Sequence, residues 1–134
     1  VGIAVGTRFP AYATSMGRVL LAGLPDARLE DYLAEVELLP LTDRTITDRN
    51  LLREEVLRVR AAGAAVVDQE LEAGLRSVAV PVRGPGGDVV AALNTSMQAS
   101  LGTGSGTLEE AAAQVLPQLQ AASAKITAAL AARA

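Results

Sequence analysis

The sequence predicts an α+β domain, in which helices cover the faces of an antiparallel sheet. Three observations indicate this class. The first half of the chain has apolar residues at helical spacing, residues 77–97 contain two β-rich segments around a Gly-Pro-Gly-Gly turn, and the end of the chain is rich in alanine. With 134 residues, half of them hydrophobic, the chain is long enough to form one domain with its own core.

The composition excludes several classes of function. The chain has no cysteine and no histidine, which excludes disulfides, thiolate and imidazole catalysts and the usual zinc ligands. We therefore expect no metal and no cofactor. Aromatic residues make up 2% of the chain and its net charge is -3, which argues against a nucleic-acid-binding surface.

Targeting signals are also missing from the sequence. No apolar run approaches the roughly 20 residues that a membrane span needs. The start at Val1 has neither a methionine nor a basic leader. We therefore expect a fragment of a longer, cytoplasmic polypeptide that does not bind a membrane.

The first segment, Val1 to Phe9, alternates in hydropathy and predicts a strand that ends before Pro10. Thr14 or Ser15 then caps a first helix, and a second helix begins at Pro25-Asp26. The predicted inward faces are Met16, Val19, Leu20, Gly23 and Leu24 in the first helix and Leu29, Leu33 and Val36 in the second.

A loop over Glu37 to Thr45 precedes a third helix, which Thr47 or Asp48 caps. Gly63 is placed to end this helix, because glycine readily adopts the left-handed conformation of a C-cap. The helix repeats Leu52, Val56 and Val59 on one face, and Glu54 and Arg58 form an i, i+4 charge pair.

Three strands are predicted next, over Ala64 to Asp68, Ser77 to Arg83 and Asp88 to Met97. The last two form a hairpin through residues 84–87, where the order of Pro and Gly suits a type II turn. A glycine-rich stretch, Gly102 to Gly106, leads into the last helix.

The last helix begins with a Thr-x-x-Glu capping box at Thr107 and Glu110. Pro117 falls inside it and should kink or interrupt it. A narrow apolar seam at spacings of three and four consists of Leu108, Ala112, Val115, Leu119, Ala122, Ile126 and Ala129.

The start of the first helix is one candidate binding site. Free backbone N–H groups and the helix dipole attract anions there, and the small residues Thr14, Ser15 and Gly17 would let a carboxylate approach the backbone of Ser15, Met16 and Gly17. The alternative is an ordinary N-cap followed by a close helix contact at Gly17.

A second candidate is the pair Asn94 and Ser96 in the last predicted strand. Alternation places both side chains on the face that Val90 and Ala92 also occupy. Polar groups on an apolar face need hydrogen-bond partners, which a bound polar ligand would supply. The alternative is a strand end exposed to solvent.

The charged loop 68–77 is a third candidate. Asp68 or Glu70 could anchor a ligand hydroxyl, Ser77 could donate to it, and Arg76 could pair with a carboxylate. Arg76 and Ser77 lie on opposite faces of a strand, so at most one should face a given pocket. A solvated acidic loop is the alternative.

No catalytic machinery is evident. Glu54 and Glu55 diverge by about 100° on a helix, so they cannot converge on one substrate. A serine nucleophile would depend on Lys125 or a carboxylate as its base, and Lys125 belongs to the last helix. We therefore predict a protein that is not an enzyme.

In this order, the segments resemble the effector-binding domain of IclR-family bacterial transcriptional regulators. The sequence of residues 8–12 and 14–18 is most similar to the sequences of the subgroup that regulates protocatechuate, 4-hydroxybenzoate and β-ketoadipate pathways. The likeness covers nearly the whole chain and is carried by residues 5–22, 45–48, 63–70, 74–82 and 91–96.

The resemblance implies a GAF-like, profilin-like sheet with helices on its faces, forming one domain over residues 1–134. The family's N-terminal winged helix-turn-helix, through which DNA is bound, is missing from this sequence. The resemblance also implies a small carboxylate effector and assembly into a homodimer or tetramer. Together with the three candidate sites, it predicts a ligand site made by Thr14, Ser15, Met16, Gly17, Asp68, Ser77, Asn94 and Ser96.

Two departures from the family pattern are visible. Some relatives have a cysteine where Ser77 stands and a serine where Asn94 stands, and the metal of a few relatives would lack cysteine and histidine ligands here.

The leading hypothesis is a sensor of protocatechuate, 4-hydroxybenzoate or β-ketoadipate. The alternatives are an oligomerisation module with a vestigial pocket and, third, a carboxylate-dependent hydrolase.

Overall fold

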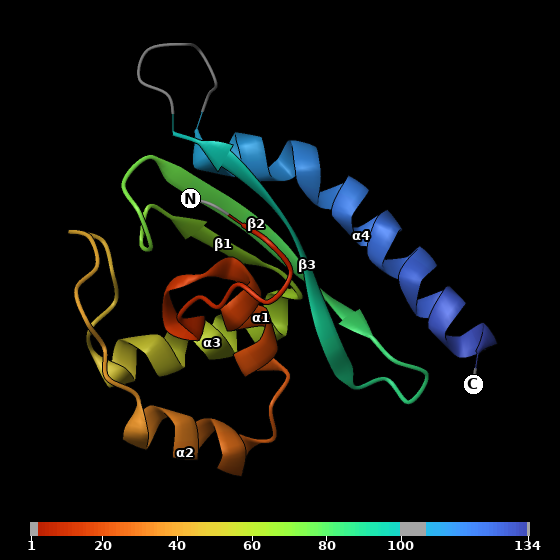
Figure 1. Cartoon of the computed structure of the whole chain (residues 1–134), viewed down its shortest axis with the longest axis horizontal. Coiled ribbons are helices and arrows are strands. Elements are labelled where there is room, and N and C mark those ends of the chain that lie inside the picture. The colour runs from red at the N-terminus through yellow and green to blue at the C-terminus, as the bar shows by residue number, and fades with distance from the viewer. Residues whose placement is uncertain (1–2, 100–106, 134) are drawn as a thin grey trace.

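The computed structural model describes residues 3–99 and 107–133 of the chain. A three-stranded antiparallel sheet, β1 (Ala65–Asp68), β2 (Leu75–Arg83) and β3 (Val89–Gln98), has helices on both faces (Figure 1). The predicted α+β class is therefore confirmed. The other elements, in chain order, are η1 (Ala11–Ala13), α1 (Ser15–Ala22), α2 (Asp26–Glu35), α3 (Arg49–Ala62) and α4 (Leu108–Ala132).

One face of the sheet is covered by α1, which packs on all three strands, and α3 and α2 lie beyond it. The core between these layers contains Leu29 and Leu33 of α2, Leu52 and Val56 of α3, and Ala79 of β2. The apolar spacings predicted for α2 and α3 are thus confirmed. Helix α4 crosses the opposite face and contacts β2 and β3 (Figure 1).

Helix ends follow the predicted capping chemistry. Asp48 caps α3 by accepting hydrogen bonds from Asn50 N and Leu51 N at 2.8 and 3.0 Å. Gly63 ends the same helix with φ +72°, a conformation in which a side chain would be strained. The predicted pair of Glu54 with Arg58 is wrong, because Arg58 turns to Glu55, one residue further along.

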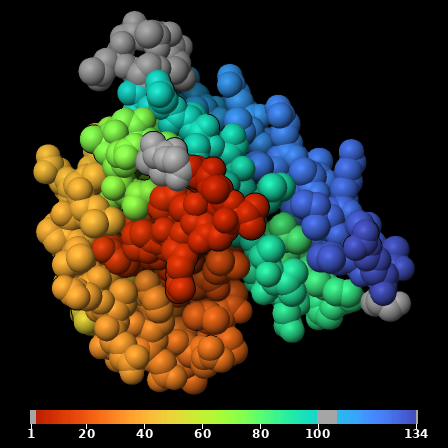
Figure 2. Space-filling view, in the orientation of Figure 1, coloured from red at the N-terminus to blue at the C-terminus, as the bar shows by residue number. Residues whose placement is uncertain are grey.

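The strand predicted over Val1 to Phe9 is wrong for the described residues 3–9. A turn bends this segment, with Gly6 at φ +94° and Thr7 N donating to Ala4 O at 3.0 Å. Alternating sequence makes a strand only where a partner strand accepts its hydrogen bonds, and no described strand pairs with it. In Figure 2 this segment lies at the centre of the visible face, beside α1.

The apolar stripe predicted for α1 is only partly correct. Val19 is buried, whereas Leu20 is 43% exposed and Arg18 is buried instead. The reason is that η1, α3 and the sheet surround α1, so that it buries a wide face rather than a narrow stripe.

The predicted hairpin is confirmed, but its turn is not type II. That type requires a positive φ at Gly86, whereas the positive φ of +90° is at Gly87, and Gly84 O accepts a hydrogen bond from Gly87 N at 3.0 Å. A left-handed glycine after the turn is typical of a hairpin with a bulge. Gly87 is that residue here, because Gly84 N donates to Asp88 O at 2.9 Å and leaves Gly87 as the extra residue. A separate bulge follows at Val90, because Val82 pairs with Ala91 and Arg83 pairs with Val89.

Helix α4 runs through Pro117 without interruption, contrary to one of the two predicted outcomes. Its predicted seam is correct as far as Ala122, since Ala112 is buried and Leu108, Val115, Leu119 and Ala122 are half-buried. It is wrong at its end, where Ile126 is 38% exposed and Ser123 is buried instead. A straight helix has 3.6 residues per turn and drifts away from a seam of period 3.5 unless a partner helix supercoils with it. The sheet beneath α4 imposes no supercoil. The predicted stretch Gly102 to Gly106 lies outside the described residues.

Candidate ligand-binding site

The N-terminus of α1 leaves two backbone donors without partners. Thr14 is the N-cap: its Oγ1 accepts a hydrogen bond from Gly17 N at 3.1 Å and donates to Pro10 O at 3.2 Å. No described residue accepts a hydrogen bond from the N–H of Ser15 or Met16, as is usual in the first turn of a helix. These two groups, at the positive end of the helix dipole, can bind an anion.

The hydroxyl oxygen of Ser15 is buried at this helix end. Ser15 is 1% exposed, and its Oγ has no hydrogen-bond partner among the described residues. A buried hydroxyl without a partner typically costs about 1–3 kcal/mol. A polar group from outside the protein could remove this cost by pairing with the hydroxyl.

A pocket of about 240 Å³ opens beside this helix end. Its polar lining comes from the N-terminal end of α1, from the face of the two longer strands toward α1, and from Glu72 in the loop between β1 and β2. Six of the eight predicted site residues line it: Thr14, Ser15, Met16, Ser77, Asn94 and Ser96.

Strand pairing brings the polar side chains of the sheet together. Ser77 of β2 lies directly opposite Ser96 of β3, and Asn94 is two residues before Ser96 on the same face. The expected face is correct for Ala92 but wrong for Val90, which is 57% exposed. The bulge changes the alternation, so that Val89 packs toward α1 instead.

Sequence reasoning missed part of the lining. Gln98 extends the alternation of Asn94 and Ser96 by one step and could have been found by continuing it. Leu71 and Glu72 come from the loop between β1 and β2 and carry no local signal of their position. Leu75 begins β2 two residues before Ser77, so alternation would have placed it on the same face.

Gly17 and Asp68 do not line the pocket, so the structure does not bring them to the ligand side as predicted. A Cβ on Gly17 would lie 2.3 Å from Ala11 Cα and O, which makes this glycine the close helix contact that was the alternative interpretation. Asp68 instead accepts hydrogen bonds from Arg76 Nε at 2.9 Å and Arg44 Nη1 at 2.5 Å. As expected, Arg76 faces away from the pocket that Ser77 lines.

The neighbours of Asp68 change the pKa of its carboxyl group. Burial raises the pKa of Asp68, but hydrogen bonds from Arg76 and Gln69 and the charges of Arg76 and Arg44 outweigh it. The pKa of Asp68 therefore lies below its ordinary value. The ionised carboxylate supports the end of β1 beneath the pocket loop.

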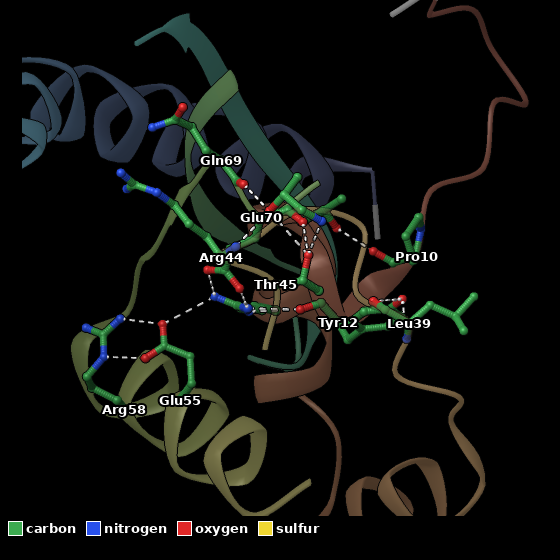
Figure 3. Close-up of polar contacts among 12 residues, drawn as sticks. Pro10, Tyr12, Leu39, Arg44, Thr45, Glu55, Arg58, Gln69 and Glu70 are labelled. Carbon is green, nitrogen blue, oxygen red and sulfur yellow. Dashed lines mark hydrogen bonds and ion pairs between the residues drawn. The ribbon is translucent and has the colours of Figure 1, made fainter. Parts of the chain in front are cut away.

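A buried ion pair beside the pocket was also missed. Arg18, on α1, is 1% exposed and forms a two-point pair with Glu70, which follows β1 (Figure 3). A charged residue in a helical pattern is normally assigned to the exposed face, so the sequence carried no sign of this burial.

A second pocket offers fewer free polar groups to a ligand. A pocket of about 330 Å³ lies at the other end of the sheet, where Arg60 already donates to Ala22 O and Leu24 O at 2.9 and 3.1 Å. Among residues 3–99 and 107–133, no cluster of acidic side chains is placed to hold a metal ion. No helix in the same residues is long and apolar enough to cross a membrane.

Comparison with known proteins agrees with this architecture. The family model described as the bacterial transcriptional regulator IclR C-terminal domain matches residues 1–128. The Pca regulon regulatory protein of Pseudomonas putida is 48% identical over 123 residues, which are 92% of this chain and 41% of that protein.

Two solved structures have the same fold. A Rhodococcus sp. RHA1 protein described as a transcriptional regulator superposes with a TM-score of 0.91 at 52% identity, covering 98% of this chain and 51% of that one. The inducer-binding domain of the Acinetobacter transcription factor PobR, a double mutant in complex with 3-hydroxybenzoic acid, superposes with a TM-score of 0.82 at 33% identity. That match covers 92% of this chain and 69% of the PobR chain. The chain thus spans about half or less of the regulators from Pseudomonas and Rhodococcus.

Proposed function

We propose a ligand-sensing role for this chain, which belongs to the bacterial transcriptional regulator IclR C-terminal family. The proposed ligand is a small carboxylate of aromatic catabolism, in the class of protocatechuate, 4-hydroxybenzoate or β-ketoadipate. The single observation that carries the proposal is the buried Ser15 hydroxyl without a partner, at a helix N-terminus that opens into a pocket.

The ligand carboxylate would accept hydrogen bonds from the N–H groups of Ser15 and Met16, and from Ser15 Oγ once this buried hydroxyl turns toward the pocket. Its other polar atoms would meet Ser77, Asn94 and Ser96. A pocket of about 240 Å³ suits a small acid. The names of the relatives point the same way, since one regulates a Pca regulon and another was solved with a hydroxybenzoic acid.

The role of the whole protein is part of the proposal. We propose that an N-terminal winged helix-turn-helix binds DNA, that the protein assembles as a dimer or tetramer in the cytoplasm, and that the ligand binds one arrangement more tightly than another. A ligand with equal affinity for both arrangements would shift nothing. The relatives are transcriptional regulators, which supports a function without catalysis.

The test is isothermal calorimetry of the purified chain with protocatechuate, 4-hydroxybenzoate and β-ketoadipate. We expect binding of at least one compound, weakened about tenfold or more by Asn94→Ala and by Ser96→Ala, because each removes a polar contact. Glu54→Gln, an exposed substitution on α3, is the matched control and should leave affinity unchanged. Silence across the panel at millimolar concentrations would reject this ligand class and favour an oligomerisation module with a vestigial pocket.

A further inference from the structure

We infer that the buried ion pair of Arg18 with Glu70 is a positioning device that holds one wall of the pocket against the helix end that binds the ligand. The inference rests on the proposed function, since it concerns the affinity of the same site. Neither residue lines the pocket itself.

Arg18 is tied at every nitrogen of its guanidinium. Nε and Nη2 donate to Tyr12 O at 3.2 and 3.0 Å, Nη1 donates to Glu70 Oε2 at 2.9 Å, and Nη2 also donates to Glu70 Oε1 (Figure 3). A bidentate pair of this kind fixes orientation as well as distance. Arg18 lies three residues after Ser15 on the same short helix, so its position is tied to that of the pocket's anion-binding end.

Glu70 stands at the start of the opposite wall. It directly precedes Leu71 and Glu72, which line the pocket. The backbone here is strained, because Gln69 has φ +59° without being glycine. Side chains of Thr42 and Thr45 donate to the carbonyls of Gln69 and Glu70, each at 2.6 Å, and keep this conformation in place.

The ion pair therefore links α1 directly to the start of the loop over residues 69–74, which lies outside the strands. Stability alone is a weak reason for it, because apolar residues of similar volume often serve a buried site equally well. An apolar pair makes no directional hydrogen bonds, so it would not fix the orientation of the two side chains. The bidentate geometry specifies where residues 71–75 lie relative to Ser15.

A second carboxylate makes the inference testable without unfolding the protein. Glu55 Oε2 is 3.5 Å from Arg18 Nη1, and Arg58 holds Glu55 through two hydrogen bonds of 2.7 Å. If Glu70 is neutralised, Arg18 keeps Glu55 as a counter-charge. Glu70→Gln, which preserves shape, should therefore still fold.

The first experiment compares Glu70→Gln with Val56→Ala, a core truncation at a fully buried site of α3 that does not line the pocket. We expect Glu70→Gln to raise amide hydrogen exchange of residues 71–75 at least tenfold relative to α3, without ligand. The affinity for protocatechuate should fall at least tenfold. Val56→Ala should lower the melting temperature without either local effect. The inference would be overturned if Glu70→Gln and Val56→Ala gave the same ratio of the exchange rate at residues 71–75 to the exchange rate in α3.

The second experiment uses the double variant Arg18→Met/Glu70→Leu, which covers the outcome in which Glu70→Gln fails to fold. We expect its melting temperature to return toward that of the wild type, while exchange at 71–75 stays fast and affinity stays low. A double variant that regains slow exchange together with stability would overturn the inference. If no compound of the panel binds the wild type, the proposed function fails, and the exchange measurements decide the positioning role separately.

Discussion

Replacing Ser15 by alanine should make the unliganded protein more stable and the ligand complex weaker. Ser15 Oγ is buried and has no partner among the described residues, so the unliganded protein bears the desolvation of this hydroxyl without compensation. Most truncations of buried side chains destabilise a protein. The opposite sign expected here makes this substitution diagnostic.

The magnitude follows from the burial. Removing an unsatisfied buried hydroxyl should recover about 1–2 kcal/mol, which for a chain of this length raises the melting temperature by roughly 3–7 °C. In the complex, the same substitution deletes a hydrogen bond to a carboxylate, worth about 1.5–3 kcal/mol. The dissociation constant should therefore rise by about 10- to 100-fold.

The assay is thermal unfolding with and without millimolar protocatechuate, together with calorimetric titration. Ser123→Ala is the matched control, because Ser123 is also buried but its Oγ donates to Pro81 O at 2.7 Å. That substitution should destabilise the protein by about 1 kcal/mol and leave ligand affinity unchanged. If Ser15→Ala lowers stability as much as Ser123→Ala does, the reasoning about Ser15 is refuted.

Three further predictions concern the scaffold. Gly17→Ala should cost about 2–3 kcal/mol in unfolding free energy, because its Cβ would overlap the backbone of Ala11; a denaturant midpoint equal to wild type would contradict this contact. Gly63→Ala should cost about 1 kcal/mol in the same measurement, since alanine is strained at the φ of +72° observed there. Asp68→Asn should destabilise the protein at pH 7 but not at pH values well below 3. The folded-state pKa of Asp68 is lowered, so the ionised group contributes stability that is fully present above its unfolded pKa of about 3.9 and is lost as the pH falls through the folded pKa. A pH-independent difference in unfolding free energy between pH 2 and 7 would rule out this linkage.

Local chemistry explains which elements could be predicted from the sequence. Asp48 and Gly63 bound α3 through capping groups that act within three residues, and the hairpin of β2 and β3 follows from one glycine-rich turn. Asn94 and Ser96 stood out because strand alternation alone places them on one face, and Ser77 stood out at the end of the charged loop 68–77.

Long-range packing explains what was missed. The segment over residues 3–9 alternates like a strand but has no described partner. The bulge at Val90 moved one residue of the expected face, and the packing of α4 on a sheet rather than on a second helix buried Ser123 in place of Ile126. None of these outcomes is encoded within a single element.

Residue types and their near neighbours were enough to predict the helices, the hairpin, the lack of thiol and imidazole groups in this chain and the polar residues available for a ligand. Three features follow from the packed fold instead: Ser15 Oγ has no partner among the described residues, Arg18 is buried against Glu70, and Asp68 turns away from the pocket. The physical reason is that the burial and pairing of a polar group depend on segments tens of residues away, whose approach is set by packing.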